Sequence, residues 1–248
     1  MWHDIVVMTG VISFVDNLVD NLLDLLFPKR CVNCAAVGGF VCEECFRQVK
    51  YCEVQVCPQC TEPSIGGFTH PLCRRRLGAE RTLCVFKFEG PIKESISALK
   101  YGGVRALAGF MADLAVAAFT EASVSFGTDS LILPVPLHPV KKLERGFNQT
   151  EILAKAFGQR LSLEVWPDLL VKKKDNPSQT KLDREQRAAN VRDAFGVNER
   201  DSRPDLLKGR DVVIVDDVFT SGATLRECAK VVKGGGARYV YLLALAKD

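Results

Sequence analysis

The stretch VVIVDDVFTSGAT, residues 212–224, places two adjacent carboxylates at the end of an apolar strand. The run of β-branched residues from Val212 to Val215 is typical of a strand buried on both faces, as strands of parallel sheets are. Asp216 and Asp217 then stand at the carboxyl end of that strand, where open α/β sheets bind their ligands. The TSGAT that follows predicts the start of a helix, whose N–H groups and dipole suit a phosphate.

The two carboxylates narrow the class of ligand. They would repel a phosphate at contact distance, so Asp216 and Asp217 are expected to accept hydrogen bonds from neutral groups beside it. The vicinal hydroxyls of a ribose meet that requirement, and the motif therefore predicts a ribose 5-phosphate site. A solvated strand end with a capped helix explains the hydroxyls of the loop but not two carboxylates at a buried edge. The expected phosphate-binding residues are Thr220, Ser221, Gly222, Ala223 and Thr224.

Other loops that bind phosphate between a strand and a helix fit the sequence less well. G-x-x-x-x-G-K-[ST] occurs nowhere, which argues against a P-loop ATPase. No G-x-G-x-x-G follows a predicted strand. The GGG at 234–236 follows a predicted helix and is typical of a helix C-terminus.

Apolar runs elsewhere in the chain predict further strands of the same sheet. Buried strands are expected at 131–137, 211–217 and 238–246, and helices at 104–121, 148–161 and 222–233. Apolar strands that alternate with helices indicate an α/β fold, a parallel sheet with helices on both faces. The 248 residues suffice for one such core and a small second module. The expected divisions are an N-terminal helix at 1–30, a cysteine-rich module at 31–84 and an α/β domain at 85–248.

Nine of the ten cysteines lie between residues 31 and 84, and six of them form Cys-x-x-Cys pairs. Each pair can fold as a knuckle that holds one ion with two thiolates, and two knuckles complete a tetrahedral zinc site. The spacing predicts one site of four thiolates and a second of three thiolates and a histidine, both closed and structural. Their ligands are expected to be Cys31, Cys34, Cys42 and Cys45, and then Cys57, Cys60, His70 and Cys73.

Several alternatives stay open for this module. Spare thiols, a redox pair, an iron–sulfur cluster and an interleaved choice of ligands all fit the same spacing. The lone Cys52, Cys84 and Cys228 are expected to be small buried residues. The N-terminus lacks a basic region followed by a cleavage site, so we expect a reducing cytoplasm, where clustered cysteines bind metal more often than they form disulfides.

The first thirty residues predict an amphipathic helix and no transmembrane segment. Asp16, Asp20 and Asp24 recur every four residues on a polar face, opposite an apolar stripe. Three carboxylates would be very costly in hydrocarbon, so packing on the protein is favoured over peripheral membrane contact. The net charge of +3 is too small to indicate nucleic-acid or membrane binding by itself.

Four motifs and the cysteine module carry a family resemblance. VVIVDDVFTSGAT resembles the phosphoribosyl pyrophosphate (PRPP) motif of type I phosphoribosyltransferases. From about residue 20 to the end, the chain resembles the ComF family of ComFC and GntX-like proteins, on the motifs ALKYGG (98–103), LPVPLHPVKKLERGFNQTEILAKAF (133–157) and PSQTKLDREQRAANVRDAF (177–195). These are phosphoribosyltransferase-like proteins with an N-terminal zinc ribbon, and they are associated with DNA uptake in naturally competent bacteria.

The resemblance implies a role for each matching position. Asp216 and Asp217 would be the catalytic pair that binds the ribose 2′- and 3′-hydroxyls, beside a loop that binds the 5-phosphate. The segment from Pro136 through Arg145 lies where the family places its pyrophosphate loop, and Lys100 is a weaker candidate for the same group. Magnesium would bind together with PRPP, and no residue of the protein is assigned as its ligand.

Two of these segments have simpler interpretations. ERGFNQ at 144–149 also fits a loop whose Asn148 caps the next helix, and KKK at 172–174 fits a solvated face. Residues 172–210 carry eleven Lys/Arg against seven Asp/Glu, however, which suits a basic segment over an anionic ligand or against single-stranded DNA. By the resemblance, the flexible loop that closes over the site corresponds to residues 172–190.

One position departs from the family pattern. Relatives commonly have a fourth Cys-x-x-Cys near residue 73, and this chain has Arg76 at its second position. The second metal site therefore depends on His70.

The expected reaction displaces pyrophosphate from the anomeric carbon of PRPP by a nitrogen nucleophile, with magnesium bridging the ligand oxygens. The sequence does not specify the acceptor, and His138 is a candidate general base. Two alternatives remain, a PRPP-responsive binding protein without catalysis and a protein that handles single-stranded DNA with its ribbon and basic loop. The expected cofactors are structural zinc and magnesium, and the expected partners are PRPP, single-stranded DNA and proteins of the DNA-uptake machinery.

Overall fold

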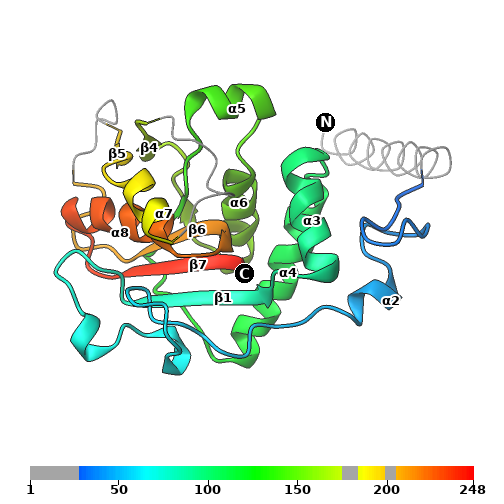
Figure 1. The fold of residues 1–248 in the computed structure, drawn as a ribbon, viewed down its shortest axis with the longest axis horizontal. Coiled ribbons are helices and arrows are strands. Elements are labelled where there is room, and N and C mark those ends of the chain that lie inside the picture. The colour runs from blue at the N-terminus through cyan, green and yellow to red at the C-terminus, as the bar shows by residue number, and fades with distance from the viewer. Residues whose placement is uncertain (1–27, 175–183, 199–204) are drawn as a thin grey trace, which may run out of the picture. The chain divides into compact units, whose positions relative to one another are not determined.

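The computed structural model describes residues 28–174, 184–198 and 205–248, which Figure 1 draws as a coloured ribbon. The chain forms two compact units, Met1–Gln48 and Val49–Asp248. Most of the predicted N-terminal helix, and residues 175–183 of the predicted flexible loop, lie outside the described residues. Within the described residues, no helix has the length and apolar character needed to cross a membrane.

The described part of the first unit is a cysteine knuckle followed by one helical turn. The backbone turns back on itself between Arg30 and Val37, which form an antiparallel bridge. The N–H of Ala35 donates to the carbonyl of Cys31 over 2.8 Å, which closes the knuckle. Helix α2 (Glu43–Phe46) then follows directly on Cys42, its N-cap residue.

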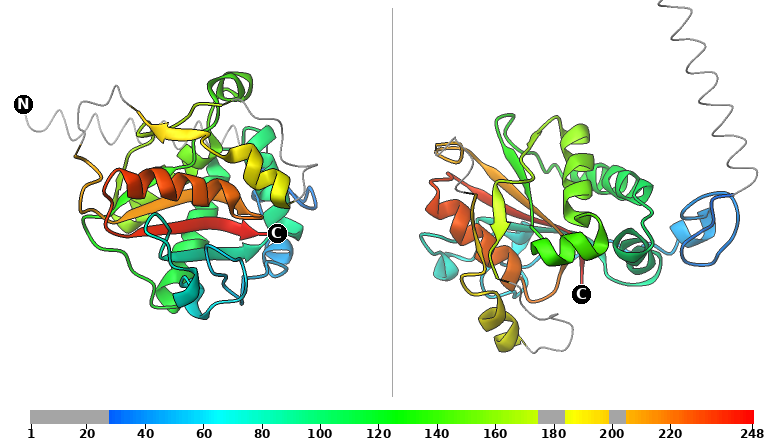
Figure 2. Two further views of the ribbon diagram at one scale, coloured as in Figure 1. Left: turned by 60° about the vertical axis from the view of Figure 1, so that its left-hand side comes forward. Right: turned by 90° about the horizontal axis from the view of Figure 1, so that it is seen from above.

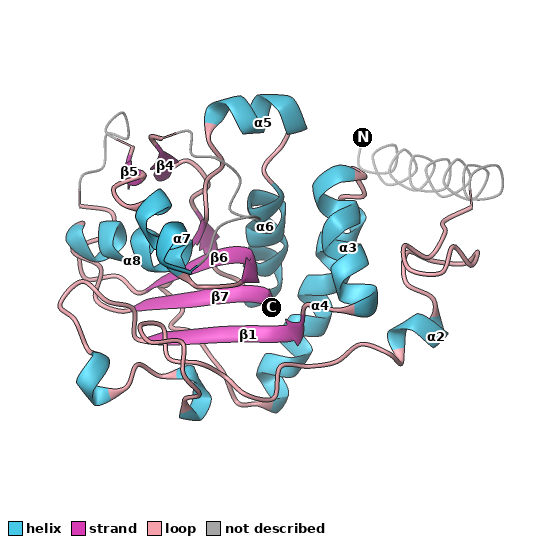
Figure 3. Ribbon diagram, viewed as in Figure 1, coloured by secondary structure: helices cyan, strands magenta, loops and turns pink. Residues whose placement is uncertain are grey.

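Five parallel strands form the sheet of the second unit, in the order β1-β7-β6-β2-β3. Figure 3 shows β1, β7 and β6 side by side. This confirms the predicted parallel sheet, and the predicted strands at 131–137, 211–217 and 238–246 correspond to β2, β6 and β7. The four residues at the start of β6 are fully buried because both faces of the sheet are covered. The strand bounds are β1 (Arg81–Lys87), β2 (Leu131–Pro134), β3 (Glu164–Val165), β6 (Val212–Phe219) and β7 (Val240–Lys247).

Helices cover both faces of this sheet, as Figure 2 shows. One face carries α6 against β2 and β6, with α4 packed on α6 and α3 on α4. The other carries α8 against β6 and β7, with α7 and the antiparallel pair β4–β5 beside it. The short helix α5 lies between β2 and α6 in the sequence. The bounds are α3 (Gly90–Tyr101), α4 (Ala106–Glu121), α5 (Pro139–Arg145), α6 (Gln149–Leu161), α7 (Arg184–Val191), α8 (Ala223–Gly234), β4 (Leu170–Lys172) and β5 (Phe195–Val197).

The second cysteine segment, residues 49–80, pairs with the outer edge of β1. Tyr51 and Phe86 form an antiparallel bridge. The side chain of Gln55 continues the pairing, because its Oε1 accepts the N–H of Cys84 over 2.9 Å and its Nε2 donates to the carbonyl of the same residue over 2.8 Å. The backbone approaches β1 so closely at Gly67 that a Cβ there would lie 1.9 Å from the carbonyl oxygen of Thr82. The segment therefore covers a sheet edge that would otherwise be open. Its two short 3₁₀ turns are η1 (Ile65–Gly67) and η2 (Pro71–Cys73).

Candidate functional site

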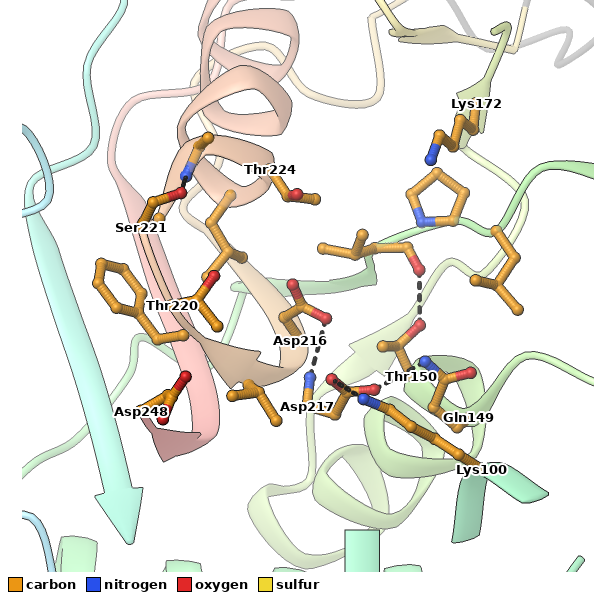
Figure 4. A pocket seen from close by; sticks show the side chains of 18 of the residues that line it. Lys100, Gln149, Thr150, Lys172, Asp216, Asp217, Thr220, Ser221, Thr224 and Asp248 are labelled. Carbon is orange, nitrogen blue, oxygen red and sulfur yellow. Dashed lines mark hydrogen bonds and ion pairs between the residues drawn. The ribbon is translucent and has the colours of Figure 1, made fainter. Parts of the chain in front are cut away.

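A cavity of about 400 Å³ opens at the carboxyl end of β6, and Figure 4 shows the side chains around it. We call it the β6 cavity. Both predicted carboxylates line it from within β6, which continues past them to Phe219. Because side chains alternate along a strand, Asp216 and Asp217 leave β6 in opposite directions. Asp216 is half-buried, whereas Asp217 is only 5% exposed.

Asp217 is held by donors from two helices. Lys100, near the end of α3, places its Nζ 2.9 Å from Asp217 Oδ1. Gln149, the first residue of α6, donates from Nε2 to Asp217 Oδ2 over 2.7 Å. A buried carboxylate is tolerated when it is paired and hydrogen-bonded, and here each oxygen has a donor. The Asp217 carboxylate is therefore fixed in orientation, and its remaining lone pairs can accept a ligand hydroxyl.

Asp216 is poised between its charged and neutral forms. Its Oδ1 accepts the backbone N–H of Asp217 over 2.9 Å. Burial, followed by the charge of Asp217, raises the pKa of Asp216 to about 7, although Lys100 and Lys172 oppose the rise. A ligand that donates hydrogen bonds to this carboxylate favours its ionised form.

The loop from Thr220 to Thr224 forms another wall of the β6 cavity and leads into α8. Gly222 is the N-cap of that helix and adopts the left-handed backbone conformation, with φ +68°. A Cβ at this position would lie 2.5 Å from the ring of Phe219, so only glycine fits. The loop therefore sits at the positive end of the twelve-residue helix α8.

Lys172 lines the β6 cavity from β4, and Figure 4 shows its amino group directed into it. The neighbouring lysines lie elsewhere. Lys173 packs against Gly196, and Lys174 is exposed and donates to the carbonyl of Arg192 over 3.0 Å. The KKK run, which sequence alone treats as one unit, thus contributes one residue to the cavity.

The structure brings most of the predicted site residues together. Lys100, Pro136, both carboxylates and the whole 220–224 loop line the β6 cavity. Arg145 is not among the lining residues; its guanidinium carbon lies 5.1 Å from the ring centroid of Tyr101, and its Nη1 donates to Gln149 Oε1 over 2.5 Å. His138 does not line the cavity either and is the N-cap of α5. Sequence reasoning did not assign Gln149, although it ends the quoted ERGFNQ motif.

The first predicted metal cluster is assembled in the first unit. The sulfur atoms of Cys31, Cys34, Cys42 and Cys45 lie within 4.8 Å of one another. Asn33 Nδ2 donates to Cys45 Sγ over 3.3 Å, so the cluster also has a side-chain donor in its surroundings. The chemistry of four thiolates at this separation fits a tetrahedral zinc ion.

The second predicted cluster is assembled in the second unit. The ligand atoms of Cys57, Cys60, His70 and Cys73 also lie within 4.8 Å of one another. His70 Nδ1 lies 3.4 Å from Cys60 Sγ, while its Nε2 lies 3.1 Å from the carbonyl oxygen of Pro63. A proton on Nε2, donated to that carbonyl, leaves Nδ1 free to bind a metal. The structure thus places His70 where the fourth ligand was predicted.

Two thiols of the second cluster, those of Cys57 and Cys73, have pKa values displaced in opposite directions. Burial raises the pKa of Cys57, but backbone N–H groups of Cys60 and His70 outweigh it and bring the pKa to about 7. Burial and then the neighbouring thiols raise the pKa of Cys73 to about 11. A divalent cation removes this conflict because it holds all the thiolates at once. Both donor sets therefore fit structural zinc.

Two family models match the chain. The model of the double zinc ribbon domain matches residues 22–77, a range that includes both metal clusters. The model of the phosphoribosyl transferase domain matches residues 144–248, which include α6, α8 and the two carboxylates. The chain therefore combines a double zinc ribbon with a phosphoribosyltransferase domain.

The chain is also similar over most of its length to several named proteins. DNA utilization protein YhgH of Escherichia coli (strain K12) is 28% identical over 233 residues, which are 90% of this chain and 99% of that protein. Competence protein F of Haemophilus influenzae is 26% identical over 248 residues, 89% of this chain and 98% of that protein. Competence protein ComFC of Streptococcus pneumoniae is 22% identical over 210 residues, 84% of this chain and 87% of that protein.

Both clusters should hold zinc in the purified protein. We expect metal analysis of protein prepared under reducing conditions to give about two zinc ions per chain, because each cluster supplies four ligand atoms. His70→Ala should lower the content to about one, and Cys52→Ser, which changes a cysteine outside both clusters, should leave it unchanged. Zinc-free protein, or two zinc ions in His70→Ala, would contradict the assignment.

The raised pKa of Asp216 predicts a stabilising substitution. The folded protein keeps this carboxyl protonated up to pH of about 7, whereas the unfolded chain ionises it near pH 4, so its ionisation destabilises the fold as the pH rises through that window. Asp216→Asn should therefore raise the free energy of unfolding by on the order of 2–4 kcal/mol at pH 8, with a gain that shrinks toward pH 4. Urea unfolding across this range measures the difference.

Asp217→Asn is the matched comparison. It removes the partner of Lys100, whose side chain is 21% exposed, and should lower stability at pH 8. Equal losses of stability in the two variants would show that Asp216 carries no cost in the folded protein.

Proposed function

Because this chain is a ComF-family protein, a double zinc ribbon joined to a phosphoribosyltransferase domain, we propose that it binds PRPP in the β6 cavity and transfers its phosphoribosyl group. One observation carries the proposal. Two carboxylates and a glycine loop at a helix N-terminus line a single cavity at the carboxyl end of β6. The carboxylates suit a vicinal diol and the loop suits a phosphate, and a phosphorylated ribose has both.

The 5-phosphate is assigned to the loop from Thr220 to Thr224. The N-terminus of a helix directs its first backbone N–H groups outward and carries partial positive charge, which suits an anion, and this loop lies at the N-terminus of α8. The hydroxyls of Thr220, Ser221 and Thr224 are further donors at the same wall. Ser221 Oγ already accepts the N–H of Ala223 over 3.4 Å, so its proton is available to a phosphate oxygen.

The ribose hydroxyls are assigned to Asp216 and Asp217. Asp217 is held ready by Lys100 and Gln149, so little ordering is required when the ligand arrives. Asp216 ionises as it accepts the hydroxyl, because hydrogen bonds to a carboxylate lower its pKa. The pair thereby fixes the anomeric carbon relative to the rest of the cavity.

The pyrophosphate is assigned to the wall formed by Pro136, Lys100 and Lys172. Positive charge at this wall stabilises the leaving group, which gains charge as the bond from its oxygen to the anomeric carbon breaks. Magnesium, when bound together with PRPP, would supply further neutralisation of the leaving group. The electron pair of the broken bond stays on pyrophosphate, a nitrogen of the acceptor forms the new bond, and that nitrogen releases its proton.

Removal of the carboxylate charges should abolish tight PRPP binding. Each lost charge-assisted hydrogen bond is worth roughly 1.5–3 kcal/mol, so Asp216→Asn with Asp217→Asn should weaken binding roughly a hundredfold or more in calorimetry with magnesium. Asp216→Asn alone provides a variant that we expect to remain folded. Asp113→Asn on α4, which removes a carboxylate outside the β6 cavity, is the control. Unchanged affinity in the double variant would reject the site.

Pyrophosphate release separates a transferase from a PRPP-responsive binding protein. The protein is incubated with PRPP and magnesium, with and without a panel of nucleobases, amines or DNA. Release that depends on one acceptor supports transfer. Tight PRPP binding without release under every condition supports the binding protein.

A second candidate function, contact with single-stranded DNA in the cytoplasm, has its own structural support. A cavity of about 500 Å³, the ribbon cavity, is lined by the aromatic rings of Phe68, Tyr239 and Tyr241 together with Arg74 and Arg75. Phe68 and Tyr239 are about half exposed, at 52% and 47%. Exposed rings beside arginines suit the bases and phosphates of a single strand. The names of relatives, DNA utilization protein and competence protein, favour this partner and proteins of DNA uptake.

Affinity for an oligothymidylate should fall steeply with salt, with a slope of about 0.7 per phosphate contact on a log–log plot. Arg74→Ala with Arg75→Ala should flatten that slope more than Lys173→Ala with Lys174→Ala. PRPP should not compete with the oligothymidylate. The ribbon cavity lies at the start of β7, roughly 26 Å along that strand from its carboxyl end, where the β6 cavity lies. Fluorescence anisotropy that shows no binding at low salt would remove this candidate.

A further inference from the structure

The second metal cluster is in contact with the helix that starts at the 220–224 loop. Pro58 lies between the ligands Cys57 and Cys60 and is buried. Its carbonyl oxygen accepts a hydrogen bond from Arg226 Nη1 over 3.2 Å. Arg226 belongs to the first turn of α8, and its backbone N–H donates to the carbonyl of Gly222 over 2.9 Å. Arg226 therefore donates one hydrogen bond to the metal knuckle and another to the loop.

The guanidinium of Arg226 also packs against the loop directly. A Cβ on Gly222 would lie 3.0 Å from Arg226 Nη1, on the same side as the ring of Phe219. That guanidinium and that ring thus both pack on the side of Gly222 where a Cβ would lie, while the glycine keeps its left-handed conformation. A shift of Arg226 would remove one of these two groups from the loop.

Apolar packing joins the same two parts of the molecule. Val56, which precedes the first ligand of the knuckle, is 2% exposed and belongs to the buried cluster that includes Phe219, Ala223 and Leu225. Interiors are close-packed, so displacement of the knuckle is transmitted to the residues that flank the loop.

We propose that Arg226 is a positioning residue through which the second Cys–His cluster holds the 220–224 loop, so that zinc in this cluster sets the affinity of the β6 cavity for PRPP. A closed thiolate site ties metal binding to local folding. Loss of the metal frees the four ligands, and the Pro58 carbonyl is then no longer held against Arg226. The inference rests on the proposed PRPP site, and the first cluster, which belongs to the other compact unit, serves as its comparison.

Substitution of the arginine tests the link with both metal clusters intact. Arg226→Gln should keep two zinc ions and weaken PRPP binding about tenfold, because a hydrogen bond from a charged donor is lost. Arg226→Lys, which keeps the charge, should recover part of the affinity. Lys230→Gln is the matched control, since Lys230 lies one turn further along α8 and pairs with Glu227 over 2.7 Å. Equal affinity of Arg226→Gln and Lys230→Gln would overturn the role of Arg226.

A mutant cycle tests whether the arginine and the metal act together. Cys73→Ser and Cys45→Ser each remove one ligand from one cluster, and Cys73→Ser should weaken PRPP binding at least tenfold more than Cys45→Ser does. Arg226→Gln should add little to Cys73→Ser but its full effect to Cys45→Ser. Equal losses from the two cysteine variants, or additive losses throughout, would contradict the coupling.

Hydrogen exchange provides a readout that does not need the ligand. The amides of residues 219–226 should exchange faster in Arg226→Gln and in Cys73→Ser than in Cys45→Ser, all without PRPP. If the unmodified protein fails to bind PRPP, the proposed function is wrong, and exchange in this loop still decides the coupling. Unchanged exchange in both Arg226→Gln and Cys73→Ser would overturn it.

Discussion

The adjacent carboxylates of Asp216 and Asp217 at the end of a buried strand are the constraint on which the second unit depends. Desolvated charges of one sign repel each other, so neighbouring elements must supply counter-charge and hydrogen bonds. Lys100 from α3 and Gln149 from α6 converge on Asp217 and satisfy it. Asp216 retains a pKa of about 7, so its ionisation lowers the free energy of unfolding. Binding sites commonly keep such destabilising groups, because a substitution that removes the destabilisation also removes function.

The zinc ribbon contributes to the fold of the phosphoribosyltransferase domain as well as standing beside it in sequence. Its second half pairs with the edge of β1 through Tyr51 and Gln55, and its metal knuckle contacts α8 through Pro58. A single residue, Arg226, thereby contacts both the metal knuckle of that half and the loop assigned to phosphate. This arrangement gives a physical reason for a structural metal in the same chain as the proposed ribose-phosphate site.

The sequence predicted the elements whose signals are local. β2, β6 and β7 are continuous apolar runs, and the 220–224 loop, its glycine and both carboxylates lie within thirteen residues. β1 was not predicted, because its sequence RTLCVFK adjoins the cysteine module. Its strand conformation depends on pairing with β7 and with the ribbon, which are distant contacts.

Contacts between residues that are far apart in the sequence could not be predicted, because no local pattern specifies them. Gln149 meets Asp217 across 68 residues of sequence, and only the packing of α6 on the sheet brings them together. The same limit applies to Lys172, since KKK is uniform in sequence and β4 alone decides which lysine faces the cavity.

Proton release on PRPP binding tests the central claim, that Asp216 and Asp217 receive the ribose. Calorimetry at pH 7 in buffers of different ionisation enthalpy counts the protons released when PRPP and magnesium bind. A carboxyl with a pKa of about 7 is half protonated there, so the unmodified protein should release roughly half a proton more than Asp216→Asn. Equal proton release from the two proteins would show that PRPP does not meet the Asp216 carboxylate.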